Sequence, residues 1–226
     1  TTSGATDASS YEWAISPSEA GNISGTGTTG TVDWSNTYSG TANITVRGIN
    51  GCGNGAWSNS LSVTINPLPG KAATPSGISS RCEGSGTSDF TTTGASDADS
   101  YEWSIAPSGA GSISGTGTTG TVTWDASFSG TATVEVRGVN SCGNGIWSNQ
   151  KSITVNPLPG KAATPSGIST RCQGSGTGDY TTTGASDADS YEWSIAPADA
   201  GTISGTGTTG TVTWDASFSG TATVEV

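Results

Sequence analysis

The sequence has no histidine, no methionine and little positive charge, since only 7 of its 226 residues are lysine or arginine. Eighteen acidic residues bring the net charge to −11, so the chain would repel a phosphate backbone, and nucleic acid is not an expected partner. The four cysteines lack the close spacing of a zinc or redox motif, and no histidine can complete such a site. A metal centre built on sulfur is therefore not expected.

Long hydrophobic runs are also missing. No stretch approaches the roughly 18 apolar residues that a membrane helix needs, so no membrane span is expected in this segment. Leu, Ile, Val and Phe together number 30, which taken alone would suggest disorder. Eight tryptophans and five tyrosines oppose that reading because each buries a large area, and a charged fraction of 11% is low for a disordered chain. We expect a folded protein with a thin, aromatic core.

The chain is a tandem array. In the segment Tyr101-Glu102-Trp103-Ser104-Ile105, extended geometry places Tyr, Trp and Ile on one face and Glu and Ser on the other. The same pattern stands at residues 11–15 and 191–195, so it recurs every 90 residues. This period is too long for a solenoid unit and suits a small β-domain of roughly 100 residues. Each repeat should fold as a separate domain.

Proline-rich segments divide the repeats. Residues 67–75 and 157–165 have the same sequence, and prolines at this density favour a stiff, extended linker. The predicted organisation is a partial repeat without its first strand, a complete repeat and a partial repeat without its last strand, at residues 1–66, 76–156 and 166–226. We expect the native polypeptide to continue past both termini in this register. The alternative is that one chain's end completes the next chain's beginning, as a non-covalent polymer.

Within the complete repeat, short segments with alternating apolar residues are separated by Gly-, Ser- and Asp-rich turns. The clearest alternation runs over residues 131–136, and helical periodicity is absent. This pattern predicts an all-β fold of tandem immunoglobulin-like antiparallel β-sandwich domains. The expected strands are residues 78–82, 89–93, 101–105, 112–114, 121–124, 131–136 and 147–155.

The cysteines, Cys52, Cys82, Cys142 and Cys172, suggest disulfides in an oxidising, extracellular setting. A bridge inside one repeat would join Cys82 to Cys142. The alternative joins Cys52 to Cys82 across the linker.

The aromatic residues of the repeat have different expected roles. Tyr101, Trp103 and Trp124 are in phase with inward apolar neighbours, so we expect them in the core. Trp147, and Trp57 in the first repeat, follow a Gly-rich turn where an exposed ring could stack on a sugar. Burial at the sandwich edge is the favoured alternative for them.

Two motifs could suggest other chemistry. Residues 115–120 match the glycine pattern of dinucleotide-binding loops, but a β-branched strand follows instead of the helix that would hold the pyrophosphate, so a tight turn is expected. Asp97, Asp99 and Glu102 could bind Ca²⁺ weakly, although their spacing is not that of an EF-hand and a solvated turn is the simpler reading. No cofactor is expected. Carboxylates repeated without an accompanying pocket also argue against an enzyme.

The residues of the complete repeat resemble those of PKD-like repeats in large secreted bacterial proteins. The resemblance is carried by segments 101–103, 115–118, 121–124, 139–143 and 153–157 and extends over every repeat. It implies immunoglobulin-like sandwiches arranged in series in surface adhesins and secreted hydrolases, often exported by the type IX secretion route. It also implies one cysteine early in the domain and one in an Asn-x-Cys-Gly turn, the places of Cys82 and Cys142.

The resulting expectation is a structural segment of an extracellular adhesin stalk or surface filament at the bacterial cell surface, which extends and presents a distal binding region. Expected partners are neighbouring repeats of the same chain, lateral copies of the chain and a surface or glycan ligand. The alternative is a carbohydrate-binding or spacer module of a secreted polysaccharide hydrolase.

Overall fold

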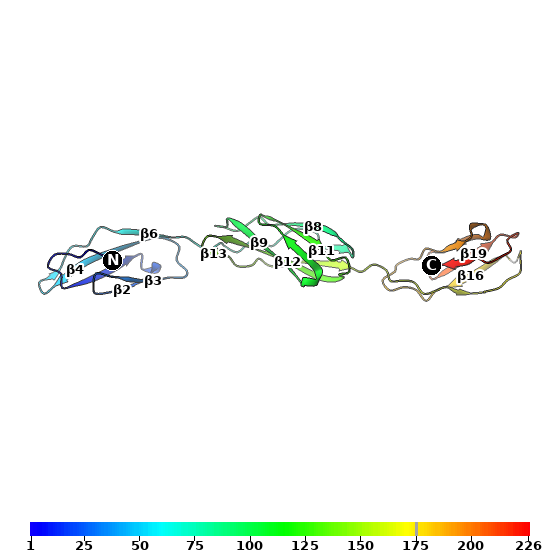
Figure 1. Ribbon diagram of the computed structural model, residues 1–226, viewed down its shortest axis with the longest axis horizontal. Coiled ribbons are helices and arrows are strands. Elements are labelled where there is room, and N and C mark those ends of the chain that lie inside the picture. The colour runs from blue at the N-terminus through cyan, green and yellow to red at the C-terminus, as the bar shows by residue number, and fades with distance from the viewer. Residues whose placement is uncertain (175) are drawn as a thin grey trace.

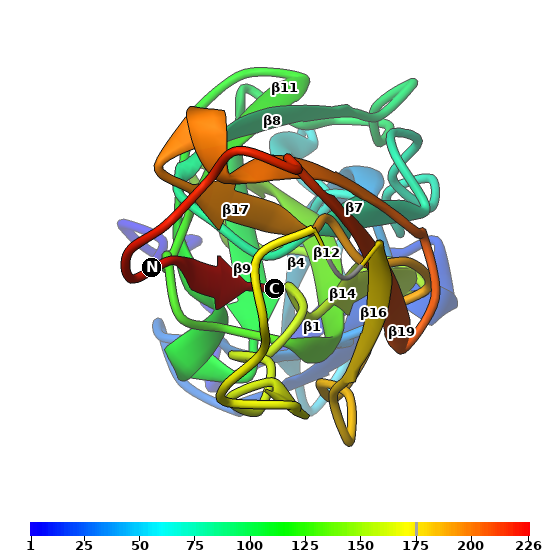
Figure 2. The ribbon, with the colours of Figure 1, turned by 90° about the vertical axis from the view of Figure 1, so that its right-hand side faces the viewer.

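The computed structural model describes residues 1–174 and 176–226. It consists of three β-domains that follow one another along a single long axis (Figure 1). Looking along this axis, the three domains lie behind one another (Figure 2), so the array is close to straight. We call them domain 1 (residues 1–66), domain 2 (67–156) and domain 3 (157–226). Within the described residues, no helix is long and apolar enough to cross a membrane.

Domain 2 holds eight strands and one short 3-10 turn. The seven predicted strands are present with shifted ends, and a two-residue strand is added after the long central one. The elements are β7 (Ser80–Cys82), β8 (Gly86–Thr91), β9 (Ser100–Ala106), η2 (Ser108–Ala110), β10 (Gly111–Ser114), β11 (Thr119–Trp124), β12 (Gly130–Asn140), β13 (Gly143–Asn144) and β14 (Lys151–Asn156).

These strands form two sheets that face each other, as predicted for a sandwich. One sheet is built around β12, which pairs antiparallel with β9, β13 and β14. The other has the order β10-β11-β8. One pairing differs from an all-antiparallel sheet, because β7 adds to the edge of β14 in the parallel direction.

Domains 1 and 3 repeat this plan in part. Domain 1 pairs β4 with β1, β5 and β6 in one sheet and β2 with β3 in another. Domain 3 pairs β17 with β20 and places β15, β16, β19 and β18 in the second sheet. Their elements are β1 (Ser10–Ser16), η1 (Ser18–Ala20), β2 (Gly21–Ser24), β3 (Thr31–Trp34), β4 (Gly40–Asn50), β5 (Gly53–Asn54), β6 (Leu61–Ile65), β15 (Ser166–Gly167), β16 (Thr177–Thr181), β17 (Ser194–Ala196), η3 (Ala198–Ala200), β18 (Gly201–Ser204), β19 (Thr209–Trp214) and β20 (Thr223–Glu225).

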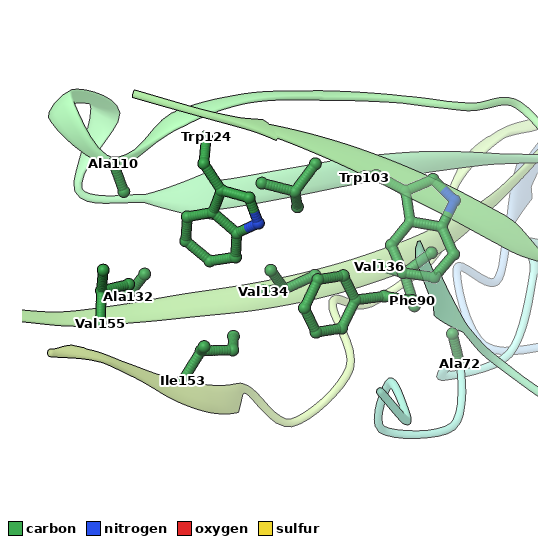
Figure 3. Close-up of a cluster of buried hydrophobic side chains, with 11 residues drawn as sticks. Ala72, Phe90, Trp103, Ala110, Trp124, Ala132, Val134, Val136, Ile153 and Val155 are labelled. Atoms are coloured by element: carbon green, nitrogen blue, oxygen red, sulfur yellow. The ribbon is translucent and has the colours of Figure 1, made fainter. Parts of the chain in front are cut away.

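The core of domain 2 lies between its two sheets (Figure 3). Alternate residues of β12 point into it, and β14 contributes the fully buried Ile153. Trp103 and Trp124 come from opposite sheets and are 8% and 4% exposed, so two large rings are packed among the aliphatic side chains of this cluster. Tyr101 packs at the edge of the same cluster.

The proline-rich segment before domain 2 is more than a linker, because it packs along that domain. Pro69, Ala72 and Pro75 are buried, and their spacing of three matches one face of a polyproline helix. Ala73 accepts a hydrogen bond from the Thr92 hydroxyl at 2.9 Å. The predicted linker at 67–75 therefore lies mostly inside domain 2, and the free connection between domains is only a few residues long.

Candidate functional site: the sheet face and the domain tips

A stack of three charged and aromatic side chains covers the outer face of the β9–β12 pair. Glu102 and Arg137 are cross-strand partners. The Arg137 guanidinium donates to the Glu102 carboxylate from Nε at 2.8 Å and from Nη2 at 2.7 Å. Its Cζ also lies 4.5 Å from the centroid of the Trp147 ring, a cation–π contact. The arginine is thus held between a carboxylate and an indole.

The same stack recurs in domain 1 with Glu12, Arg47 and Trp57. The ion pair spans 2.6 Å, and the guanidinium again lies 4.5 Å from the ring centroid. Trp57 is 41% exposed, whereas Trp147 is half-buried. In both domains the arginine covers one side of the ring, which reduces the area open to a sugar. Sequence reasoning missed the two arginines, although their recurrence 90 residues apart was a usable signal.

Of the acidic residues considered for Ca²⁺, Glu102 makes a contact through its carboxylate, whereas Asp97 and Asp99 make backbone hydrogen bonds, the Asp99 N–H donating to Val139 O at 3.0 Å. Glu102 is occupied by Arg137. Asp97 adopts a left-handed φ of 57° in the turn before β9, and its carbonyl accepts from the Asn140 side chain at 2.8 Å. Among the described residues, no group of three or more His, Cys, Asp or Glu side chains is placed to hold a metal ion. Asp97 and Asp99 therefore belong to a hydrogen-bonded turn before β9.

The glycine-rich motif at 115–120 forms the turn between β10 and β11, as predicted, and continues into the first two residues of β11. Its last glycine has a packing role. A Cβ at Gly120 would lie 2.4 Å from Cδ2 of Trp103, so the ring rests directly on the glycine backbone. The Trp103 N–H donates to Gly117 O at 3.0 Å, which ties the turn to the same indole. The motif therefore shapes the core.

The loop after β11 contains an exposed carboxylate with a lowered pKa. The Ser127 hydroxyl donates to Asp125 at 2.7 Å, and its backbone N–H donates at 2.9 Å. These two bonds stabilise the ionised form and so lower the pKa of Asp125. Ser217 has the same effect on the pKa of Asp215 in domain 3. The contribution to stability holds above the carboxylate's ordinary pKa and is lost as pH falls through the lowered value.

The predicted bridge between Cys82 and Cys142 is wrong, because the two residues lie at opposite ends of domain 2. Cys82 ends β7 beside Asn156, near where β12 begins, and Cys142 lies in the turn after β12 ends. Eleven residues of β12 separate the ends by about 33 Å, against the roughly 4.4–6.8 Å between Cα atoms that a disulfide requires. Both are exposed thiols.

The alternative Cys52–Cys82 bridge is wrong for the same kind of reason. Cys52 lies between β4 and β5 of domain 1, at the end of that domain far from domain 2, and is also an exposed thiol. Each cysteine of domain 2 instead marks one domain tip, with Cys142 facing domain 1 and Cys82 facing domain 3.

Two facing sheets, a central β12 flanked by β9 and β14, and repetition every 90 residues define the chain as a series of immunoglobulin-like β-sandwich domains. A family model described as a PKD-like domain matches residues 2–63, 68–155 and 158–226. The chain therefore belongs to the PKD-like domain family. The second match begins at residue 68, in agreement with the packing of the proline-rich segment on domain 2.

Among solved structures, the chain is similar to several multi-domain proteins. Domains A168–A170 of titin match with 13% identity over 90% of this chain and 77% of that chain, with a TM-score of 0.38. Chicken CNTN1 domains FN1–FN3 match with 16% identity over 82% and 68% of the two chains and a TM-score of 0.31. A marsupial T cell receptor matches with 14% identity over 82% and 68% and a TM-score of 0.33. No curated protein matches the sequence.

Proposed function

We propose that this chain is a structural segment of an extracellular bacterial adhesin stalk or surface filament, where it extends and presents a distal binding region. PKD-like domains are generally extracellular structural or spacer modules and are typically not catalytic. The finer role is supported by one observation above all: three domains stand in a row on connections too short to fold back (Figure 1).

The junction between domains 2 and 3 illustrates this support. Asn156 is still paired with Cys82 in β14, and the Leu158 N–H donates to the Glu83 carboxylate at 3.2 Å on the domain 2 side. On the other side, the Gly160 N–H already donates to Ser186 O of domain 3 at 2.9 Å. Pro157 and Pro159 stand between Asn156 and Gly160, so few backbone torsions are free to bend the array.

Small-angle X-ray scattering of the intact chain tests the extended role. We expect a maximum dimension set by three domains end to end and a cross-section of one domain. A variant with Pro157→Gly and Pro159→Gly should keep the folded domains but broaden the distribution of interdomain distances. A compact scattering profile for the unmodified chain would contradict the proposal.

A second candidate, a carbohydrate-binding or spacer module of a secreted polysaccharide hydrolase, is favoured by the exposed Trp57 beside Arg47. An aromatic ring next to a cation and a carboxylate can contact a sugar ring and its hydroxyls. Affinity electrophoresis in gels that contain soluble polysaccharides tests this candidate. Retardation that Trp57→Ala and Trp147→Ala abolish would support it, and equal mobility in every gel would rule it out for the glycans tried.

A further inference from the structure

One edge of the domain 2 sandwich lacks the features that usually keep sheet edges apart. Within the described residues, β10 pairs only with β11, so its other side presents unpaired backbone N–H and C=O groups. The strand reads Gly-Ser-Ile-Ser and holds neither a charge nor a proline. Proteins commonly protect an edge strand with one of these or with a covering segment. The edge of β10 is therefore open to an added strand.

Other edges of this domain are protected. The β8 edge is covered by Ser76, which exchanges two backbone hydrogen bonds with Thr91 at 2.8 and 2.9 Å. At the outer edge of β9, the Tyr101 N–H donates to Thr116 O at 2.8 Å. The short edge strand β7 carries Arg81 among its three residues. The open edge of β10 is thus an exception within its own domain.

The same edge recurs in all three domains. Residues 113–122 reappear without change at 23–32 and 203–212. Among the described residues, the corresponding strands β2 and β18 likewise pair only with β3 and β19. Residues 111–124 hold no charged side chain, although the chain has a net charge of −11. The repulsion between two copies is therefore weakest where these uncharged edges face each other.

The side chains at this edge are short. Ser112 and Ser114 are exposed on the outer face of the sheet, with Thr123 and Thr121 opposite them on β11. No long side chain projects from these positions, so another strand can approach to the roughly 4.8 Å between paired strands. Ile113 points to the opposite face and is only partly buried against the core. An added strand would cover more of this isoleucine.

We propose that β10 pairs in the antiparallel direction with β10 of a second copy of this chain, which joins two three-stranded sheets into one sheet of six strands. In a pair centred on Ile113, the two isoleucines lie opposite each other, and Ser112 faces Ser114 of the second copy. The two arrays then run in opposite directions, so that β2 of one copy can meet β18 of the other.

The repeat spacing identifies the partner as a second copy. The open edges lie on successive domains of one straight array (Figure 1), and a second copy offers the same edges at the same spacing. A four-residue edge is a small contact, but pairing at several domains at once multiplies its strength. The proposal concerns how two chains associate and holds whether or not the chain is a stalk.

Sedimentation velocity of the intact chain at increasing protein concentration tests the association. We expect a dimer in about 1 M sodium chloride, where charge repulsion is screened beyond about 3 Å, and a weaker dimer as the salt is lowered. The edge variant combines Ser24→Glu, Ser114→Glu and Ser204→Glu, one exposed position in each domain. It should raise the concentration at half-association at least about tenfold, because carboxylates would enter the paired edges.

The control variant combines Thr41→Glu, Thr131→Glu and Thr221→Glu, which add the same charge at exposed positions away from β2, β10 and β18. It should leave the concentration at half-association within about twofold of the unmodified chain. Equal effects of the edge and control variants would overturn the proposal, and so would the absence of a dimer of the unmodified chain at every concentration and salt tested.

Hydrogen exchange of the unmodified chain locates the contact without any substitution. Backbone amides of residues 111–118 should exchange more slowly in concentrated than in dilute protein, whereas those of 151–156 should exchange at the same rate in both. Association that leaves the exchange of 111–118 unchanged would overturn the proposal, because the copies would then meet through another surface. This outcome is separate from the extended shape of the single chain, which scattering measures.

Discussion

At the scale of single residues, domains 2 and 3 differ in how they satisfy one buried indole. The Trp124 N–H donates to the Ser88 hydroxyl at 3.0 Å. Its counterpart Trp214 has a buried Nε1 with no hydrogen-bond partner among the described residues, and the serine is replaced there by Gly178. An unpaired buried donor costs on the order of 1–3 kcal/mol, so one substitution leaves domain 3 with a local defect.

Restoring the serine should therefore stabilise domain 3. A Cβ at Gly178 would lie 3.5 Å from the Trp214 nitrogen and 2.9 Å from an Arg171 guanidinium nitrogen, the end of a flexible side chain that can shift. We expect Gly178→Ser to raise the free energy of unfolding of domain 3 by about 1–2 kcal/mol, measured by urea denaturation. Gly178→Ala is the control, since it stiffens the strand without offering an acceptor. A serine variant no more stable than the alanine variant would contradict this explanation.

Trp103 should be the most costly side chain to remove from domain 2. It is almost fully buried and joins the two sheets through its packing on Gly120. Trp103→Ala is expected to lower the free energy of unfolding of that domain by about 3–5 kcal/mol. Trp147→Ala removes the same side chain from a half-buried position and should cost clearly less. Chemical denaturation measures both changes. Equal losses of unfolding free energy in the two variants would contradict this prediction.

The sequence alone predicted that Trp103 and Trp124 lie in the core, because they are in phase with inward residues of regular strands. It did not predict the arginine that lies over Trp147, since that contact joins residues from β12 and the loop before β14. It failed for Cys82 and Cys142, because sequence separation carries no information about which end of a sandwich a residue occupies.

At the scale of elements, the turn from β10 to β11 depends on where its glycines lie. A Cβ added at Gly117 would meet no heavy atom within 4 Å, whereas one added at Gly120 would collide with the Trp103 ring. Neither glycine adopts a positive φ, so a substitution tests sterics alone. The two glycines, three residues apart, form a matched pair.

We expect Gly120→Ala to destabilise domain 2 by about 1–3 kcal/mol, because the added methyl forces the Trp103 ring out of place. Gly117→Ala should change stability by about 0.5 kcal/mol or less, as an exposed substitution. Thermal unfolding monitored by tryptophan fluorescence provides the measurement. Similar shifts in the two variants would mean that the close contact at Gly120 relaxes easily.

Among the elements, alternation of apolar residues predicted seven of the eight strands of domain 2 within a few residues and missed the two-residue β13. It could not predict that β7 pairs in parallel, because pairing direction follows from how the chain crosses between sheets. The docking of residues 67–75 was missed for a different reason. A polyproline helix has a period of three, and Pro69, Ala72 and Pro75 look like linker composition when only periods of two and 3.6 are sought.

At the scale of the whole molecule, Cys82 and Cys142 lie at the two ends of domain 2, beside its junctions with the neighbouring domains. Leu158 has its N–H on the carboxylate of Glu83, the residue next to Cys82. Its counterpart one repeat earlier, Leu68, would be 3.2 Å from a Cβ at Gly143, the residue next to Cys142. Leu158 thus contacts the Cys82 end of the domain before it, and Leu68 contacts the Cys142 end of the domain after it.

The two junctions are equivalent in sequence. If one junction leucine makes both contacts, the cysteine equivalent to Cys82 in the domain before it and the cysteine equivalent to Cys142 in the domain after it lie beside the same leucine. We predict that a chain extended after Val226 by a second copy of residues 137–156 forms a disulfide between Cys82 and the added cysteine when glutathione disulfide accepts the two electrons. Non-reducing peptide mapping identifies the linked peptides, and Cys82→Ser is the control that should leave the added cysteine free. A Cys82–Cys142 linkage within one chain would contradict the strand arrangement of domain 2, and absence of any linkage would show that the two tips do not meet. The expected bridge would join successive domains covalently, so that pulling on the array loads the crosslink as well as the short proline connection.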